Sequence, residues 1–483
     1  MHALSHSLAG AGTPEEAGAR RWLRAHGGAV KCVHGWTHIL GNIAEAESPG
    51  RDLDGGRVTT LLASLPALTS FRLTVLADPD RCRSAAAVRA LLAGAARAIG
   101  RCSGLQQLRL HADLLGRESG QLPEALAREL ARAHVLEEVD LDFGAPRACR
   151  RPATFSLAHL VAGLTSLSRL RTLCLAADNV GMEATLPACV SCLAQLTSLT
   201  LGMSHGLRCA PGWARLPALE RLAFVYCAFA GDGEAALPGM DALVALTSLS
   251  VKECPSLRAL PASLWRLSQL CSIVHQTSRW ALADVPRSER PGAGLPSSGA
   301  PCFASLSSLS LVGQNLLLFP PGILAATRLT YLDLSHSCFE QLPERVSALT
   351  ALEELRLGRS SAAELEIGGA LDARALGSLA GFANLRGLCF AGCSVLLCPS
   401  FQSAAAHPRL TRLQLDTSFP ALGPSCGAVL VFVIALLQQG RSDVLVLADC
   451  VIFGAGRQDS RDFRGALRAV GYPLSEADSY DLV

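Results

Sequence analysis

The sequence is short of several residue types, and each shortage narrows the class of protein. Lysine occurs only at Lys31 and Lys252, asparagine is scarce, and aromatic residues make up 5% of the chain. The net charge is +2, and no long stretch carries a strong excess of either sign. We therefore predict no nucleic-acid partner. Because half of the residues are hydrophobic and few are aromatic, the core should be aliphatic.

Long apolar runs and export signals are also missing. The longest apolar stretch, residues 428–437, is shorter than the roughly 20 residues that a membrane-spanning helix needs. Residues 1–20 contain neither a long apolar run nor a cleavage motif. The 18 cysteines are scattered, without the clustered spacing of a disulfide framework. These features predict a cytoplasmic protein with free thiols and no membrane insertion.

Motifs of catalysis and metal binding are few. The sequence has no H-E-x-x-H and no G-x-x-x-x-G-K-[ST]. Its one C-x-x-C pair, Cys189 and Cys192, is either a redox or metal pair or two small packing residues. The absence of a second pair at zinc-like spacing favours the packing interpretation. We predict no enzymatic activity, no cofactor and no bound metal.

The strongest signal is an internal repeat of the pattern L-x-x-L-x-L. Its clearest copies begin at Leu306, Leu329 and Leu352, 23 residues apart. Weaker copies begin at Val30 and Leu270. The other copies begin at Leu68, Leu105, Leu136, Leu170, Leu196, Leu219, Leu246, Leu385, Leu410 and around Leu445. The pattern predicts about fourteen stacked units.

Each copy is typical of a short strand. Alternate side chains of a strand point to opposite faces, so the leucines should point into the core and the residues between them onto a concave sheet. A small polar residue usually follows the strand, where it can bond buried backbone groups of the next turn. In this chain that position holds Asp113, Asp178, Ser204, Cys227, Cys254, Ser278, Gln314, Ser337, Ser360, Cys393, Ser418 and Cys450.

The repeat resembles the leucine-rich repeat, L-x-x-L-x-L-x-x-N/C-x-L, over roughly residues 60–452. The segment Leu342–Leu355 looks like the 23-residue intracellular type of plants, algae and bacteria. This resemblance implies an α/β solenoid, a horseshoe with a parallel concave sheet and with short helices and loops on the convex side. It also implies a protein-binding role, and some algal relatives associate with the ciliary axoneme.

We predict three segments along the chain. Residues 1–29 should form an N-terminal cap with a helix over 14–26, and residues 30–455 should form the repeat array. Within the array, residues 84–99 read as a helix, and the Pro/Gly/Ser-rich stretch 286–301 reads as a flexible loop. Residues 456–483 should form a C-terminal cap helix and tail.

Candidate partner-binding residues lie at the outward positions of the strands. Four carboxylates share one strand region, Glu137, Glu138, Asp140 and Asp142, which is either a solvated acidic face or a contact for a basic partner. Other candidates are aromatic or charged residues of later strands: Tyr226, Tyr331, Asp333, His336, Arg356 and Arg359. Tyrosine and arginine are common anchors of protein interfaces.

These observations predict a non-enzymatic scaffold that binds protein partners of unknown identity on its concave face and is monomeric on its own. One alternative is the substrate-recognition subunit of an F-box type ubiquitin ligase, although the 29 residues before Val30 leave little room for that module. A second alternative, an enzyme on a repeat scaffold, needs a clustered nucleophile and base. A third, an extracellular receptor, needs a signal peptide and Cys-rich caps.

Overall fold

The computed structural model describes the repeat strands and most of the segments between them. The described residues are 4–7, 32–38, 67–76, 92–97, 99–113, 122–144, 154–178, 181–183, 185–203, 205–277, 295–296, 300–314, 316, 318–337, 342–359, 382–391, 409–416 and 445–449. They belong to two compact units, Met1–Leu257 and Arg258–Val483. We describe each unit by itself.

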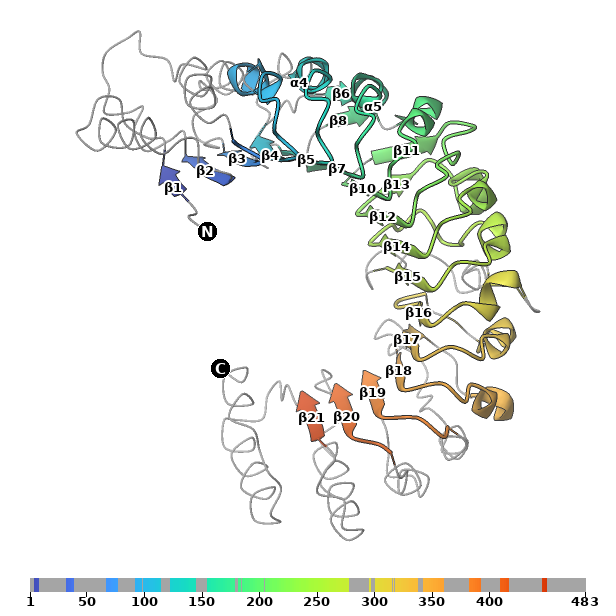
Figure 1. Cartoon of the computed structure of the whole chain (residues 1–483). Coiled ribbons are helices and arrows are strands. Elements are labelled where there is room, and N and C mark those ends of the chain that lie inside the picture. Colours follow the sequence, from blue (N-terminus) through green and yellow to red (C-terminus); the bar gives the residue numbers. More distant parts are fainter. Residues whose placement is uncertain are drawn as a thin grey trace, which may run out of the picture. The chain divides into compact units, whose positions relative to one another are not determined.

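The first unit contains a sheet of parallel strands that follow one another in chain order (Figure 1). Consecutive repeats contribute neighbouring strands, which is the topology of a solenoid. The strands are β1 (Leu4–Ser7), β2 (Cys32–His38), β3 (Ser70–Leu76), β4 (Gln107–Asp113), β5 (Glu138–Gly144), β7 (Thr172–Asp178), β10 (Ser198–Gly202), β12 (Arg221–Val225) and β14 (Ser248–Lys252).

The second unit repeats this arrangement with the same parallel order. Its strands are β15 (Ser272–Gln276), β16 (Ser308–Ser310), β17 (Tyr331–Ser337), β18 (Glu354–Arg359), β19 (Gly387–Ala391), β20 (Arg412–Asp416) and β21 (Leu445–Asp449).

The strand register confirms the leucine frame that the sequence predicts. Leu199 of β10 pairs with Leu222 of β12, which pairs with Leu249 of β14. All three are buried, whereas the residues between the leucines are partly exposed. The weak copy at Val30 is in the same frame, because Val33 pairs with Phe71. The fold is an α/β leucine-rich-repeat solenoid.

Helical segments cover the other side of each sheet (Figure 1). The first unit has two described α-helices of eight or more residues, α4 (Leu122–Leu130) and α5 (Leu157–Leu164). Later repeats use single 3₁₀ turns: η4 (Ala188–Cys192), η5 (Gly233–Ala235), η6 (Met240–Ala242), η7 (Ala262–Arg266), η10 (Pro301–Ala304), η11 (Pro321–Ala325) and η12 (Glu344–Ala348). Three to five residues suffice for such a turn.

The L-P frame marks where several of these turns begin. Pro187, Pro261 and Pro343 each occupy the N-cap position in extended backbone. Proline fits a helix start, because the backbone N–H that it lacks has no partner there in any case. Some repeats of the first unit also carry short strands outside the main sheet, which the sequence does not reveal. These are β6 (Thr154–Ser156), β8 (Gly181–Glu183), β9 (Thr185–Leu186), β11 (His205–Cys209) and β13 (Ala228–Phe229).

The position after the strand bonds neighbouring repeats, as the sequence predicts. In the first unit the Cys227 thiol donates to the Leu201 carbonyl at 3.4 Å, and the Cys227 N–H donates to Cys254 Sγ at 3.3 Å. In the second unit Gln314 Nε2 donates to the His275 carbonyl at 3.2 Å. Cysteine and glutamine therefore take the role that asparagine has in the repeat consensus.

A second ladder of side chains was not predicted. The residue after the first leucine of several repeats is threonine or serine, and its hydroxyl donates to a backbone carbonyl of the preceding repeat. These residues are Thr197, Thr247, Ser307, Thr330 and Thr411, with donor–acceptor distances of 3.0 to 3.3 Å. Each of these carbonyls also accepts two backbone N–H groups of the following repeat, so the hydroxyl adds a further bond at the same point between repeats.

The predicted segments are described only in part. Residues 4–7 of the N-terminal cap form strand β1, while the expected helix over 14–26 lies outside the described residues. Residues 92–97 and 99 are helical within the predicted helix 84–99. Most of the 286–301 loop and all of 456–483 lie outside the described residues. The two units divide at Leu257 and Arg258, before that loop.

Candidate protein-interaction surface

The residues between the leucines point away from the helices and form what we call the sheet face of each unit. In the first unit this face carries only small side chains over β7 and β10. The outward residues there are Thr172, Cys174, Ala176, Ser198, Thr200 and Gly202. In each unit, charged and aromatic side chains concentrate over a few strands. Those concentrations are where side chains can distinguish one partner from another.

The charged concentration of the first unit is the ionic cluster, which we define as Arg109, His111, Glu138, Asp140, Asp142 and Cys174 on β4, β5 and β7. Arg109 Nη2 lies 2.8 Å from Glu138 Oε1, and His111 Nδ1 lies 2.7 Å from Asp142 Oδ2. The register places Asp140 between Arg109 and Cys174. Arg109 of β4 therefore balances the charge of Glu138 of β5, and His111 is hydrogen-bonded to Asp142.

The electrostatics of the ionic cluster follow from these pairs. The hydrogen bond from Arg109 to Glu138 raises the pKa of the guanidinium. Burial raises the pKa of the Cys174 thiol to about 12, and the charge of Asp140 adds to the rise. Cys174 is accordingly protonated at neutral pH and lacks the thiolate that a nucleophile needs.

Of the four predicted carboxylates, Glu138, Asp140 and Asp142 belong to the ionic cluster. Glu137 lies just before β5 and lines a shallow depression of about 370 Å³ with Ser168, Arg169, Arg171 and Gln195. The contact of these carboxylates with a basic partner stays a prediction. The ion pair between Arg109 and Glu138 lowers the negative charge that they present.

The raised pKa of Cys174 leads to a labelling prediction. At pH 8 a thiol with a pKa of about 12 is ionised in roughly one molecule in ten thousand, so alkylation should be slow. Cys192 and Cys271 are exposed free thiols and should react first. Timed iodoacetamide labelling followed by peptide mass spectrometry measures each rate. Equal rates for Cys174 and Cys271 would contradict the burial that we describe.

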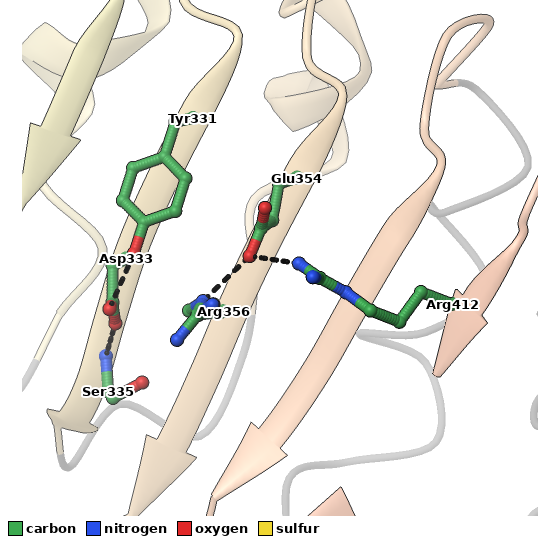
Figure 2. Close-up of polar contacts among 6 residues, drawn as sticks. All are labelled: Tyr331, Asp333, Ser335, Glu354, Arg356 and Arg412. Carbon is green, nitrogen blue, oxygen red and sulfur yellow. Dashed lines mark hydrogen bonds and ion pairs between the residues drawn. The ribbon is translucent and has the colours of Figure 1, made fainter. Parts of the chain in front are cut away.

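The concentration of the second unit is the Tyr331 cluster, defined as Tyr331, Asp333, Ser335, Glu354, Arg356 and Arg412 (Figure 2). The Tyr331 hydroxyl donates to Asp333 Oδ2 at 3.1 Å, and the Ser335 N–H donates to Asp333 Oδ1 at 2.9 Å. Both oxygens of this buried carboxylate, 6% exposed, are therefore satisfied. Tyr331 is fixed by a bond along its own strand.

Glu354 joins two arginines from different strands. Arg356 Nε donates to Glu354 Oε1 at 2.8 Å, and Arg412 Nη2 lies 2.6 Å from the same oxygen. Arg412 reaches across β19 from β20, as Figure 2 shows. Gly387 of β19 lies in register between Glu354 and Arg412. A Cβ there would stand 3.4 Å from Glu354 Cγ and 3.5 Å from Arg412 Nη2, which are ordinary contact distances, so the ion pair passes directly over Gly387.

Arg356 also contacts the aromatic ring. Its guanidinium carbon lies 5.7 Å from the centroid of the Tyr331 ring, within the range of a cation–π contact. Burial raises the pKa of Tyr331, and the charge of Asp333 raises it further. Burial lowers the pKa of Arg356, but its bond to Glu354 and the neighbouring negative charge outweigh this and raise it overall. Tyr331 therefore keeps its phenol proton, and Arg356 its positive charge, throughout the physiological pH range.

The structure brings together Tyr331, Asp333 and Arg356, three of the candidate contact residues. Asp333 is buried and acts on this surface through Tyr331. His336 and Arg359 lie at the ends of β17 and β18, and their side chains lie outside what the structure describes. Their roles stay predictions, as does that of every candidate contact.

Glu354 and Arg412 belong to the cluster but were not predicted as members of the site. Both occupy the same outward position of their repeats as Tyr331. Reading that one position across successive repeats, with glycine at Gly387, is the signal that could have found them.

Tyr226 follows β12 in an unusual backbone conformation. It is 56% exposed, and its φ is 55°, in the left-handed region that non-glycine residues rarely adopt. Met203 and Glu253 have the same φ at the equivalent points after β10 and β14. The conformation is therefore a feature of these repeats, bonded through Tyr226 N–H to the Lys252 carbonyl at 2.8 Å.

The described residues were also compared with the requirements of metal sites, membrane-spanning helices and hydrolase nucleophiles. Among the described residues no group of three His, Cys, Asp or Glu side chains could hold a metal ion. A search of the same residues finds no helix with the length and apolarity to cross a membrane. A G-x-S-x-G sequence spans residues 202–206, but it leads from β10 into strand β11 and not into the helix that follows a hydrolase nucleophile.

Comparisons with known proteins give structural similarity without sequence relatives. No protein-family model and no curated protein matches the chain. A leucine-rich-repeat protein of Leptospira interrogans is 16% identical with a TM-score of 0.47, and the match covers 84% of this chain and 98% of that one. An internalin, InlF, of Listeria monocytogenes is 14% identical over 65% and 82%, with a TM-score of 0.39.

A third similar structure is the leucine-rich-repeat ectodomain of the plant receptor kinase GASSHO1/SCHENGEN3 from Arabidopsis thaliana, solved with CASPARIAN STRIP INTEGRITY FACTOR 2. It is 14% identical, with coverage of 80% of this chain and 53% of that one and a TM-score of 0.30. We transfer no function from these structures. The fold assignment rests on the strand register of this chain.

Proposed function

We propose that this protein is a non-enzymatic scaffold that binds protein partners through the sheet face of its repeats. The observation that carries the proposal is the Tyr331 cluster, in which aromatic and charged side chains are held by hydrogen bonds on an otherwise regular sheet. Side chains fixed before binding lose less conformational freedom when a partner docks. Tyrosine and arginine are also the side chains that most often dominate interface energies.

The first unit supplies further support. Its sheet face carries the ionic cluster beside a run of small side chains over β7 and β10, so a partner's backbone can approach closely there. The exposed Tyr226 ring lies at the end of β12. Cytoplasmic location, association with the axoneme and a monomeric state stay predictions of the sequence.

Site-specific cross-linking tests the proposal. A photoreactive phenylalanine analogue replaces Ser198 on β10 or Ser308 on β16, and matched controls carry it at Val244 or Arg328, which are exposed outside the strands. In extract of the cells that express the protein, we expect one partner to be captured from Ser198 and Ser308 and not from the controls. Capture from Val244 or Arg328 alone would place the contact on the helical side and reject the proposal.

Tyr226→Gly adds a quantitative arm with a matched control. Glycine adopts a φ of 55° without strain, so the protein should stay folded while it loses the ring. The affinity for the captured partner should fall roughly tenfold or more if Tyr226 is an anchor. Glu253→Gly makes the same backbone change without removing an aromatic ring, so its affinity should stay within about twofold of the unmodified protein's.

A further inference from the structure

Over residues 258–483 the sequence has as many carboxylates as arginines. Among the side chains that the structure describes in the second unit, however, arginines outnumber carboxylates. The carboxylates are Asp333, Glu353 and Glu354, and the arginines are Arg258, Arg266, Arg328, Arg345, Arg356, Arg386, Arg409 and Arg412. Asp333 is buried, and Glu354 is shared by two arginines. Of the cluster's charged groups, the two arginines are therefore the most exposed to a partner.

The two arginines of the cluster keep donors for a second carboxylate. Arg356 bonds Glu354 through Nε, and Figure 2 shows the far end of its guanidinium turned away from Glu354. Arg412 bonds Glu354 through Nη2 alone. Their side chains are 33% and 41% exposed, against 24% for Glu354. A guanidinium offers a planar fork that matches a carboxylate with two parallel hydrogen bonds.

We infer that the Tyr331 cluster binds an acidic segment of a partner protein, whose Asp or Glu carboxylates pair with Arg356 and Arg412. Tyr331 and Glu354 hold the two guanidiniums in place before binding, and Arg412 passes over Gly387 of β19 to reach Glu354. Arg386 and Arg409, exposed just before β19 and β20, extend the positive charge beyond the cluster. The inference rests on the proposed function, because it names the chemistry of the partner for the same face.

The cluster's own carboxylates favour an acidic protein over a nucleic acid. Glu354 and Asp333 balance the charge of Arg356 and Arg412, so the four groups together are neutral. A phosphate backbone with closely spaced charges is bound by many uncompensated cations. Single carboxylates need only one well-placed guanidinium each.

Fluorescence anisotropy with labelled octaglutamate and octaglutamine tests the inference on the full chain. We expect octaglutamate to bind, octaglutamine to bind at least roughly tenfold more weakly, and the difference to shrink as salt rises. Arg356→Ala combined with Arg412→Ala should lower the octaglutamate affinity roughly tenfold. Arg345→Ala, an exposed arginine of η12, is the matched control and should leave the affinity unchanged.

A charge reversal separates recognition from misfolding. The variant that combines Arg356→Glu with Arg412→Glu should bind labelled octalysine more tightly than the unmodified protein does. Its melting temperature should stay unchanged, which shows that the new preference does not come from unfolding. Equal binding of octaglutamate and octaglutamine overturns the inference, and so does an unchanged octaglutamate affinity after the loss of both arginines. If that happens while Ser198 and Ser308 still cross-link a partner, the proposed function stands and only the acidic chemistry is rejected. Octaglutamate binding without any cross-link at those serines rejects the proposed function instead.

Discussion

Replacement of Gly313 by alanine should destabilise the second unit by roughly 3 kcal/mol or more, one of the two largest effects that we expect from a single change. Gly313 has a φ of 75°, which an L-residue with a side chain rarely adopts. The added Cβ would also overlap the backbone oxygen of Thr277. That backbone has little freedom to move, because the Thr277 hydroxyl donates to the Gly313 carbonyl at 3.0 Å.

Gly239→Ala is the matched control for this prediction. Its φ of 72° is nearly the same, but nothing lies within 4 Å of the added Cβ. Only the conformational cost then applies, so the loss should be about 1 kcal/mol. Urea denaturation followed by circular dichroism measures both variants. Equal losses would show that the contact with Thr277 does not constrain the repeat.

The leucine frame is predictable from the sequence because it is local and repeated. Alternation within a strand fixes which residues point inward, and the repetition removes doubt about where each strand begins. Buried Leu332 pairs with Leu309 on one side and with Leu355 on the other, which confirms the frame in the second unit. The polar position after the strand was predictable for the same reason, as Cys227 and Gln314 show.

The Tyr331 cluster was only partly predictable, because its contacts depend on register between distant residues. Glu354 and Arg412 meet because the stacking places their repeats in register on either side of Gly387. The burial of Asp333 depends on the orientation of the Tyr331 ring, which no spacing rule specifies. Outward position was therefore predictable, whereas the partner of each outward side chain was not.

Replacement of Trp213 by alanine should cost about 3 to 5 kcal/mol in the first unit, through the cavity that the lost ring leaves. Trp213 is 0% exposed. It takes the place that Val190 and Met240 occupy three residues before the equivalent leucines of the neighbouring repeats, so it is much larger than its counterparts. Its Nε1 donates to the Pro238 carbonyl at 3.0 Å, which ties two successive repeats together.

Two further variants separate the contributions of Trp213. Phenylalanine keeps most of the ring but removes the donor to Pro238, so Trp213→Phe should cost about 1 to 3 kcal/mol. Val244→Ala, at a side chain that is 63% exposed, should change stability by less than about 0.5 kcal/mol. Urea denaturation again provides the free energies of unfolding.

A loss below about 1 kcal/mol for Trp213→Ala would show that the repeats close around the cavity. A loss for Trp213→Phe as large as that for Trp213→Ala would assign the whole effect to the hydrogen bond. The intermediate result that we expect makes this one side chain both a packing element within its repeat and a link to the next, which is how a solenoid built from small layers accommodates an irregular residue.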